Sequence, residues 1–197
     1  MLVIVRHGNT FGAGEAPRRI GAATDLPLTE TGNAQAAALG AHFAAMGWTF
    51  ARALVSPLQR TRQTADAVIA AQAQPVPVQT AAFLREIDHG PDENRSETDV
   101  IARIGLQALA AWDEAAIAPD GWHVDAPARI AAWIDLFGEL KADAAPTLLV
   151  TSNGAARFAL VESGLRPPTL KLATGSYGVI RRGGDGNLVL AAWGVRP

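Results

Sequence analysis

The chain has 197 residues, of which 49% are hydrophobic and 18% charged, a composition typical of a globular protein with a substantial core. Its 17 basic and 19 acidic side chains give a net charge of −2, which does not favour a nucleic acid or an anionic membrane as a partner. The absence of cysteine excludes a disulfide framework, a thiolate nucleophile and a cysteine-ligated metal site. The N-terminus lacks the order of a secretory signal and no apolar run reaches the ~18 residues of a membrane span, so we expect a cytoplasmic protein.

The first half of the chain alternates short apolar runs with segments of helical spacing. Leu2–Val5 predicts a buried strand, and a Gly- and Pro-containing stretch over 8–28 predicts a long loop. The run after Thr29, which is a suitable N-cap, predicts a helix that ends near Gly47. Ala53–Val55 predicts a strand, followed by a helix to about residue 73 with Ser56 as its cap and Pro57 at its first position. Residues 76–79 and 83–87 are expected to be extended.

The second half continues the alternation. Helices are expected over 97–117 and 126–141, a strand over 148–150, and a helix from Gly154 to about residue 163. Two final strands, 177–181 and 188–192, are joined by a glycine-rich turn. This order predicts one α/β domain over 1–197, a three-layer fold with a mostly parallel sheet and helices on both faces. Residues 89–125 are expected to form a helical insertion over the site.

Polar clusters follow three of the predicted strands. They are Arg6-His7-Gly8-Asn9-Thr10, then Ser56 to Arg62, and Thr151-Ser152-Asn153-Gly154. Because the carboxyl ends of strands in an open α/β sheet converge on one crevice, these side chains should lie together. Arginine presents paired donors that suit phosphate oxygens, so the crevice is predicted to bind an anion.

Arg6-His7-Gly8 directly after a first strand resembles the histidine phosphatase superfamily, the phosphoglycerate-mutase-like proteins. Four further segments resemble that family in the same order: Gly21–Gly40, Ser56–Ala65, Leu84–Asp88 and Leu172–Ile180. The resemblance therefore covers most of the chain, and the ordered set is far more specific than the Arg-His-Gly triplet alone.

The resemblance implies roles for the polar residues. His7 would attack phosphorus and become a phosphohistidine, while Arg6 and Arg60 would clamp the phosphoryl oxygens. Glu86 would protonate the leaving alcohol and then activate water, although Asp88 and Glu93 compete with it for that role. Two neutral residues, Asn9 and Thr10, would add donors to the phosphate site. No metal or other cofactor is required, because two guanidinium groups supply the positive charge.

Asn153 departs from the family pattern, which has a second histidine at this strand end. An amide still donates an N–H to phosphate but carries no charge. The site is therefore a working one with a neutral clamp, a slow one tuned to a particular substrate, or one that binds phosphate without turnover. His89, three residues after Glu86, could face the crevice. His89, His42 and His123 are nevertheless each expected to be ordinary surface or packed histidines.

Two arginines in the long loop, Arg18 and Arg19, are expected either to contact the distal part of a substrate or to be solvated, and Arg62 is expected on another face.

The favoured function is a phosphomonoester hydrolase, with a small phosphorylated substrate or inorganic phosphate as ligand. A phosphoglycerate-type mutase and a catalytically impaired phospho-ligand-binding protein are the alternatives. Mutases of this family tend to be longer and have a C-terminal tail, and this chain ends at Pro197, which favours hydrolysis. Either a monomer or a homodimer is compatible with the sequence.

Overall fold

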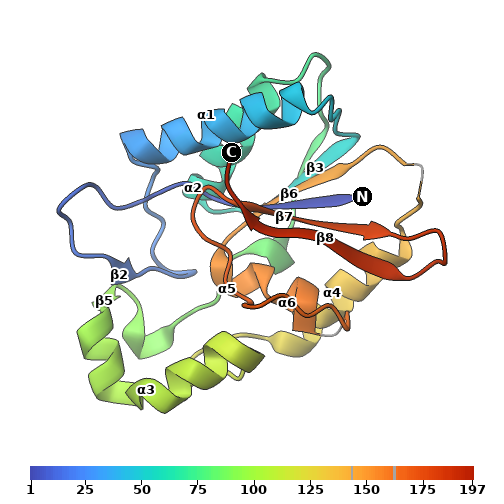
Figure 1. Cartoon of the computed structure of the whole chain (residues 1–197). Helices are drawn as coiled ribbons and strands as arrows, with labels where there is room; N and C mark the ends of the chain where they lie inside the picture. Colours follow the sequence, from blue (N-terminus) through green and yellow to red (C-terminus); the bar gives the residue numbers. More distant parts are fainter. Residues whose placement is uncertain (143, 162) are drawn as a thin grey trace.

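The computed structural model describes residues 1–142, 144–161 and 163–197 and is built on a six-stranded sheet (Figure 1). The strand order is β4-β3-β6-β1-β7-β8. The first four strands in this order run parallel, whereas β7 and β8 are antiparallel to their neighbours. The strands are β1 (Leu2–Arg6), β3 (Arg52–Val55), β4 (Val78–Thr80), β6 (Thr147–Thr151), β7 (Tyr177–Arg182) and β8 (Leu188–Val195). The expectation of a mostly parallel sheet is confirmed.

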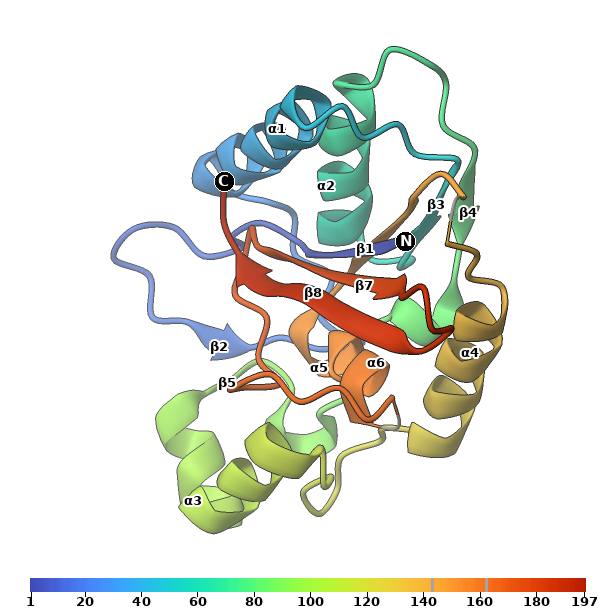
Figure 2. The ribbon, with the colours of Figure 1, turned by 45° about the vertical axis from the view of Figure 1, so that its right-hand side comes forward.

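Helices cover both faces of the sheet, as expected from the alternating pattern (Figure 2). On one face lie α1 (Glu30–Ala45) and α2 (Gln59–Ala70), and on the other lie α4 (Ala126–Gly138), α5 (Asn153–Ala156) and α6 (Phe158–Val161). Successive side chains of a strand point to opposite faces, so Val3 and Val5 join the core under α1 and α2, while Leu2 and Ile4 join the core on the other side. This two-sided burial explains the continuous apolar run of β1.

Segment 89–125 lies at one side of the sheet, beyond α5 and away from α1 (Figures 1 and 2). It contains a short 3₁₀ turn η2 (Gly90–Asp92), β5 (Arg95–Ser96) and the helix α3 (Glu97–Ala115), whose N-cap Ser96 accepts a hydrogen bond from the Asp99 N–H. β5 pairs with β2 (Arg18–Arg19), so this segment and the long loop after β1 are joined. α3 is broken at Gly105, whose φ of 79° and ψ of 160° are outside helical space.

The helix expected to start at Ser56-Pro57 begins later, at Gln59, and ends at Ala70. Its N-cap residue is Leu58, in an extended conformation with no side-chain cap. The Thr61 hydroxyl donates to the carbonyls of Ser56 and Leu58, which stabilises a turn ahead of the helix. The prediction that Ser56 caps this helix is therefore wrong.

The prediction of an extended segment over 83–87 is also wrong, because these residues form no strand. A 3₁₀ turn, η1 (Ala82–Leu84), leads into an irregular stretch that carries Glu86. The Arg129 side chain of α4 donates to the carbonyls of Phe83 and Arg85, both at 2.7 Å, and so satisfies backbone groups that a neighbouring strand would otherwise pair. The helix expected over 154–163 is instead two short helices, α5 and α6, and the helix over 126–141 ends at Gly138.

No helix in the described ranges is both long enough and apolar enough to cross a membrane.

Candidate functional site

His7 follows β1 directly and is 4% exposed. Its Nδ1 lies 2.7 Å from the carbonyl oxygen of Gly8. A carbonyl only accepts hydrogen bonds, so Nδ1 carries the proton and a neutral ring keeps its lone pair on Nε2. The chain passes very close to α1 here, since a Cβ on Gly8 would lie 2.3 Å from the Gly32 carbonyl oxygen. Glycine at both positions allows the loop to turn His7 toward the crevice.

The pKa of His7 is lowered well below its usual value of 6.5. Burial is the largest cause, and the positive charges of Arg6 and Arg60 add to it. The imidazole is therefore neutral near pH 7 and available as a nucleophile.

Arg6 ends β1 and reaches across to the segment before β7, where its Nη1 donates to the Leu172 carbonyl at 2.7 Å. Burial lowers its pKa to about 10, an effect that the negative charge of Glu86 opposes. The guanidinium is thus still charged at neutral pH. Its Nε is buried and has no partner among the described residues.

Arg60, in the first turn of α2, is fully buried and does not line the cavity. Its Nη1 and Nη2 donate to the carbonyls of Thr24 and Gly21, at 2.8 and 3.1 Å. Its charge nevertheless contributes to the lowered pKa of His7. Arg60 is thus near the nucleophile, with one N–H of each Nη bonded to the 21–24 loop.

Glu86 lies under the start of α5 and is 7% exposed. One carboxylate oxygen accepts from the Ile87 N–H at 2.9 Å and the other from the Gly154 N–H at 3.1 Å. Gly154 is tightly packed here, since a Cβ at this position would lie 2.2 Å from Glu86 Oε1. These contacts hold the carboxylate in one place.

The two asparagines of the predicted set both present their amide N–H₂ groups. Asn153 begins α5, and its Oδ1 accepts from the Leu172 N–H at 2.8 Å. Asn9 Oδ1 accepts from the Thr174 hydroxyl at 2.6 Å. With both oxygens engaged, the N–H₂ groups remain for a ligand, which suits an anion.

These residues share one cavity of about 610 Å³. Of the predicted site residues it is lined by Arg6, His7, Asn9, Thr10, Glu86 and Asn153, and also by Arg18, Arg19 and His89. Of the three acids left in competition by the sequence, Glu86 lines it, whereas Asp88 accepts from the Gly90 N–H and Glu93 from the Gly21 N–H, away from it. In the described part of the chain, no group of three or more His, Cys, Asp or Glu side chains is arranged to hold a metal ion.

Sequence reasoning missed part of this wall. Phe11, Trp112 and Thr174 line the cavity, and Thr174 falls within a segment whose family resemblance was clear. Behind Trp112 lies Arg157, fully buried, with its guanidinium carbon 4.0 Å from the Trp112 ring centroid and Nη1 donating to the Trp112 carbonyl. Burial lowers its pKa to about 10, so it stays charged. In the sequence, the one local feature that linked Arg157 to the site was its position four residues after Asn153.

The comparisons with known proteins agree with this geometry. The profile of the histidine phosphatase superfamily (branch 1) matches residues 2–193. A 2,3-bisphosphoglycerate-dependent phosphoglycerate mutase 2 of Gloeobacter violaceus is 34% identical over 113 residues, 57% of this chain and 50% of that protein. A probable phosphoglycerate mutase of Citrobacter koseri is 41% identical over 92 residues, 47% of this chain and 40% of that protein. The chain spans about half the length of the curated relatives it matches.

Solved structures show the same fold at lower identity. A mycobacterial glucosyl-3-phosphoglycerate phosphatase is 22% identical, with a TM-score of 0.78 over 100% of this chain and 99% of that one. A putative alpha-ribazole-5'-P phosphatase from Escherichia coli is also 22% identical, with a TM-score of 0.75 over 99% of this chain and 96% of that one. With the profile match over nearly its whole length and this shared fold, the chain belongs to the histidine phosphatase superfamily.

Proposed function

We propose that this protein is a phosphomonoester hydrolase that works through a phosphohistidine on His7. The observation that carries the proposal is the pairing of His7 Nδ1 with the Gly8 carbonyl, which leaves a neutral Nε2 in a cavity shared with Arg6 and Glu86. A neutral nitrogen beside a charged guanidinium is what attack on a phosphate ester requires.

In the proposed first step, Nε2 of His7 forms a bond to phosphorus and the bond from phosphorus to the ester oxygen breaks. The leaving alkoxide takes a proton from the Glu86 carboxyl. In the second step the Glu86 carboxylate takes a proton from water, whose oxygen attacks the phosphohistidine and releases inorganic phosphate with His7 neutral again. Arg6 balances the charge of the transferring group, and the N–H₂ groups of Asn9 and Asn153, with Thr10, add neutral donors.

Arg60 enters this proposal as a nearby fixed charge rather than as a full clamp, because two of its nitrogens are bonded to the 21–24 loop. One oriented donor, Nε, has no partner among the residues described. The proposal needs no metal or other cofactor.

The size of the cavity bears on the substrate. A volume of about 610 Å³ is within the range of pockets for whole small-molecule ligands and exceeds what a phosphate group fills. Phe11, Trp112 and Arg18 also line the cavity, so we propose a leaving group with apolar and polar portions.

The test is phosphate release from a panel of small phosphomonoesters by the natural protein, by His7→Ala and by His42→Gln as a matched control. His42 lies on α1 and pairs with the Tyr177 hydroxyl, outside the cavity. We expect vanadate-sensitive release that disappears in His7→Ala and persists in His42→Gln. Phosphate binding without release from any ester would instead favour a phospho-ligand-binding protein.

A phosphoglycerate-type mutase is the second candidate, because the curated relatives are named as mutases. Conversion of 3-phosphoglycerate to 2-phosphoglycerate, followed by ³¹P NMR, separates the two activities. Interconversion faster than phosphate release would favour the mutase.

A further inference from the structure

His89 is a histidine of the cavity that the proposed mechanism does not use. It precedes η2, lines the same cavity as His7, and is 5% exposed. A polar ring that is so deeply buried at the edge of a cavity needs a hydrogen-bond partner, because leaving it without one is costly.

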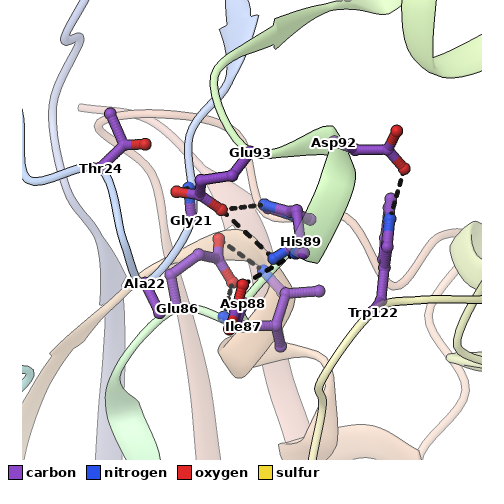
Figure 3. A network of polar contacts seen from close by, with 12 residues as sticks. Gly21, Ala22, Thr24, Glu86, Ile87, Asp88, His89, Asp92, Glu93 and Trp122 are labelled. Carbon is purple, nitrogen blue, oxygen red and sulfur yellow. Dashed lines mark hydrogen bonds and ion pairs between the residues drawn. The ribbon is translucent and has the colours of Figure 1, made fainter.

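Glu93 orients the ring (Figure 3). Its carboxylate oxygen Oε2 lies 3.4 Å from His89 Nδ1 and also accepts the His89 N–H at 3.2 Å. Burial opposes ionisation of Glu93, yet hydrogen bonds from His89, Thr24 and Gly21 bring its pKa down to about 2. A carboxylate beside Nδ1 favours a proton on that nitrogen.

The ring is confined on its other sides. Trp122 packs edge-on against it with ring centroids 4.6 Å apart, and the Trp122 indole N–H donates to Asp92 (Figure 3). A Cβ on Gly21 would lie 2.5 Å from His89 Nδ1, so the 21–24 loop closes against the ring. Nδ1 is buried and its nearest charged neighbour is Glu93 Oε2, at 3.4 Å, so Nε2 is the ring nitrogen left for the cavity.

His89 and Asn153 line the same cavity, and their segments are in contact through Gly154. Gly154, the next residue, packs on Glu86 and Ile87, since a Cβ there would lie 3.2 Å from Ile87 Cγ1. The chain then runs two residues from Ile87 to His89. The two segments therefore reach the cavity side by side, one with a neutral amide and the other with an imidazole.

We propose that His89 is a second imidazole of the phosphate site, whose protonated ring donates a hydrogen bond from Nε2 to an oxygen of the bound anion and supplies the charge that Asn153 lacks. This inference rests on the proposed function only in taking the cavity to bind a phosphate-like anion. Glu93 lies beside the ring from its own segment. The other charged side chains that line the cavity with His89 are Arg6, Glu15, Arg18, Arg19, Glu86 and Glu97. The guanidinium carbon of Arg19 lies over the Trp122 ring, 5.1 Å from its centroid.

The test measures sulfate affinity by isothermal titration calorimetry at pH 5.5 and 8.5, because sulfate keeps the same charge over that range. Burial and the charges of Arg6 and Arg60 lower the pKa of His7 well below 6.5, and the His89 variants keep His7, so the comparison isolates the contribution of His89. The proteins are the natural chain, His89→Phe, His89→Gln and the control His42→Gln. Phenylalanine keeps the packing against Trp122, and glutamine keeps a polar group that does not titrate.

We expect the natural protein and His42→Gln to bind sulfate at least ~10-fold more tightly at pH 5.5 than His89→Phe and His89→Gln do, because the variants lack the charged hydrogen bond. Affinity within twofold of the natural protein at both pH values, in a variant that unfolds at the same temperature, would overturn the inference. So would a raised KM for esters with unchanged sulfate affinity, which would place His89 on the leaving group.

The two proposals fail separately. Sulfate binding is measured without turnover, so loss of the His89 effect leaves phosphate release by His7 untouched. Absence of release from every ester would reject the hydrolase while the sulfate comparison still decides the role of His89.

Discussion

Gly154→Ala is the sharpest perturbation of the proposed chemistry, because it adds one methyl group against Glu86. The new Cβ would lie 2.2 Å from Glu86 Oε1 and 3.1 Å from its Cδ. An ordinary carbon-to-oxygen contact is about 3.3 Å or longer, so the carboxylate must move by roughly 1 Å. That movement breaks its hydrogen bonds to the N–H groups of Ile87 and Gly154.

The expected cost falls mainly on the rate. A displacement of about 1 Å of a catalytic group lowers turnover by about 100-fold, which is about 2.7 kcal/mol of activation free energy. Glu86 borders a cavity into which its side chain can turn, so the fold should lose only about 1–2 kcal/mol from the broken hydrogen bonds. We therefore expect a folded protein with little activity.

The assay compares kcat for the best ester of the panel in the natural protein, Gly154→Ala, Glu86→Gln and Gly138→Ala, with thermal unfolding of each. Gly138, at the end of α4, is the matched control, since a Cβ there meets no atom of the described residues within 4 Å. We expect Gly138→Ala to behave as the natural protein and Gly154→Ala to resemble Glu86→Gln. If folded Gly154→Ala keeps kcat within threefold, the position of Glu86 does not matter and its role as the acid is refuted.

Three further changes probe single contacts. Asn153→Asp keeps the acceptor for the Leu172 N–H but replaces the N–H₂ group with a negative charge. In a titration the affinity for phosphate should fall at least ~10-fold, without a large change in Tm. Unchanged affinity would mean that the amide does not face the phosphate. The pKa of Glu93 is about 2 in the folded protein, against an ordinary value of 4.5, so the stabilisation by this carboxylate is present above pH 4.5 and is lost as the pH falls toward 2. The unfolding free energies of the natural protein and Glu93→Gln, measured in urea, should therefore differ at pH 7 and converge near pH 2. A difference that stays constant with pH would contradict this. Gly105→Ala places an alanine at a φ of 79°, where its Cβ meets no described atom within 4 Å, so the effect reports backbone strain alone. The unfolding free energy should fall by about 1–3 kcal/mol. An unchanged Tm would show that α3 straightens at no cost.

Much of the fold was predictable because its signals are local. The apolar run of β1, the N-cap Thr29 of α1 and the alternation of strands and helices are properties of neighbouring residues, and each is confirmed. The prediction for residues 83–87 failed because a distant side chain satisfies their backbone groups. Residues 83–87 have the composition of a strand, but Arg129 satisfies their carbonyls from a helix more than 40 residues away.

For the site, the sequence by itself determined which residues stand at the strand ends and, through their order, the family to which the chain belongs. Only the tertiary structure decided how they are used. It directs Arg60 mainly to the carbonyls of the 21–24 loop, selects Glu86 from three acids as the one lining the cavity, and brings His89 to the same wall with Glu93 behind it. The reason is physical: a strand end specifies where a side chain begins, whereas its partners come from segments that only folding brings within hydrogen-bond distance.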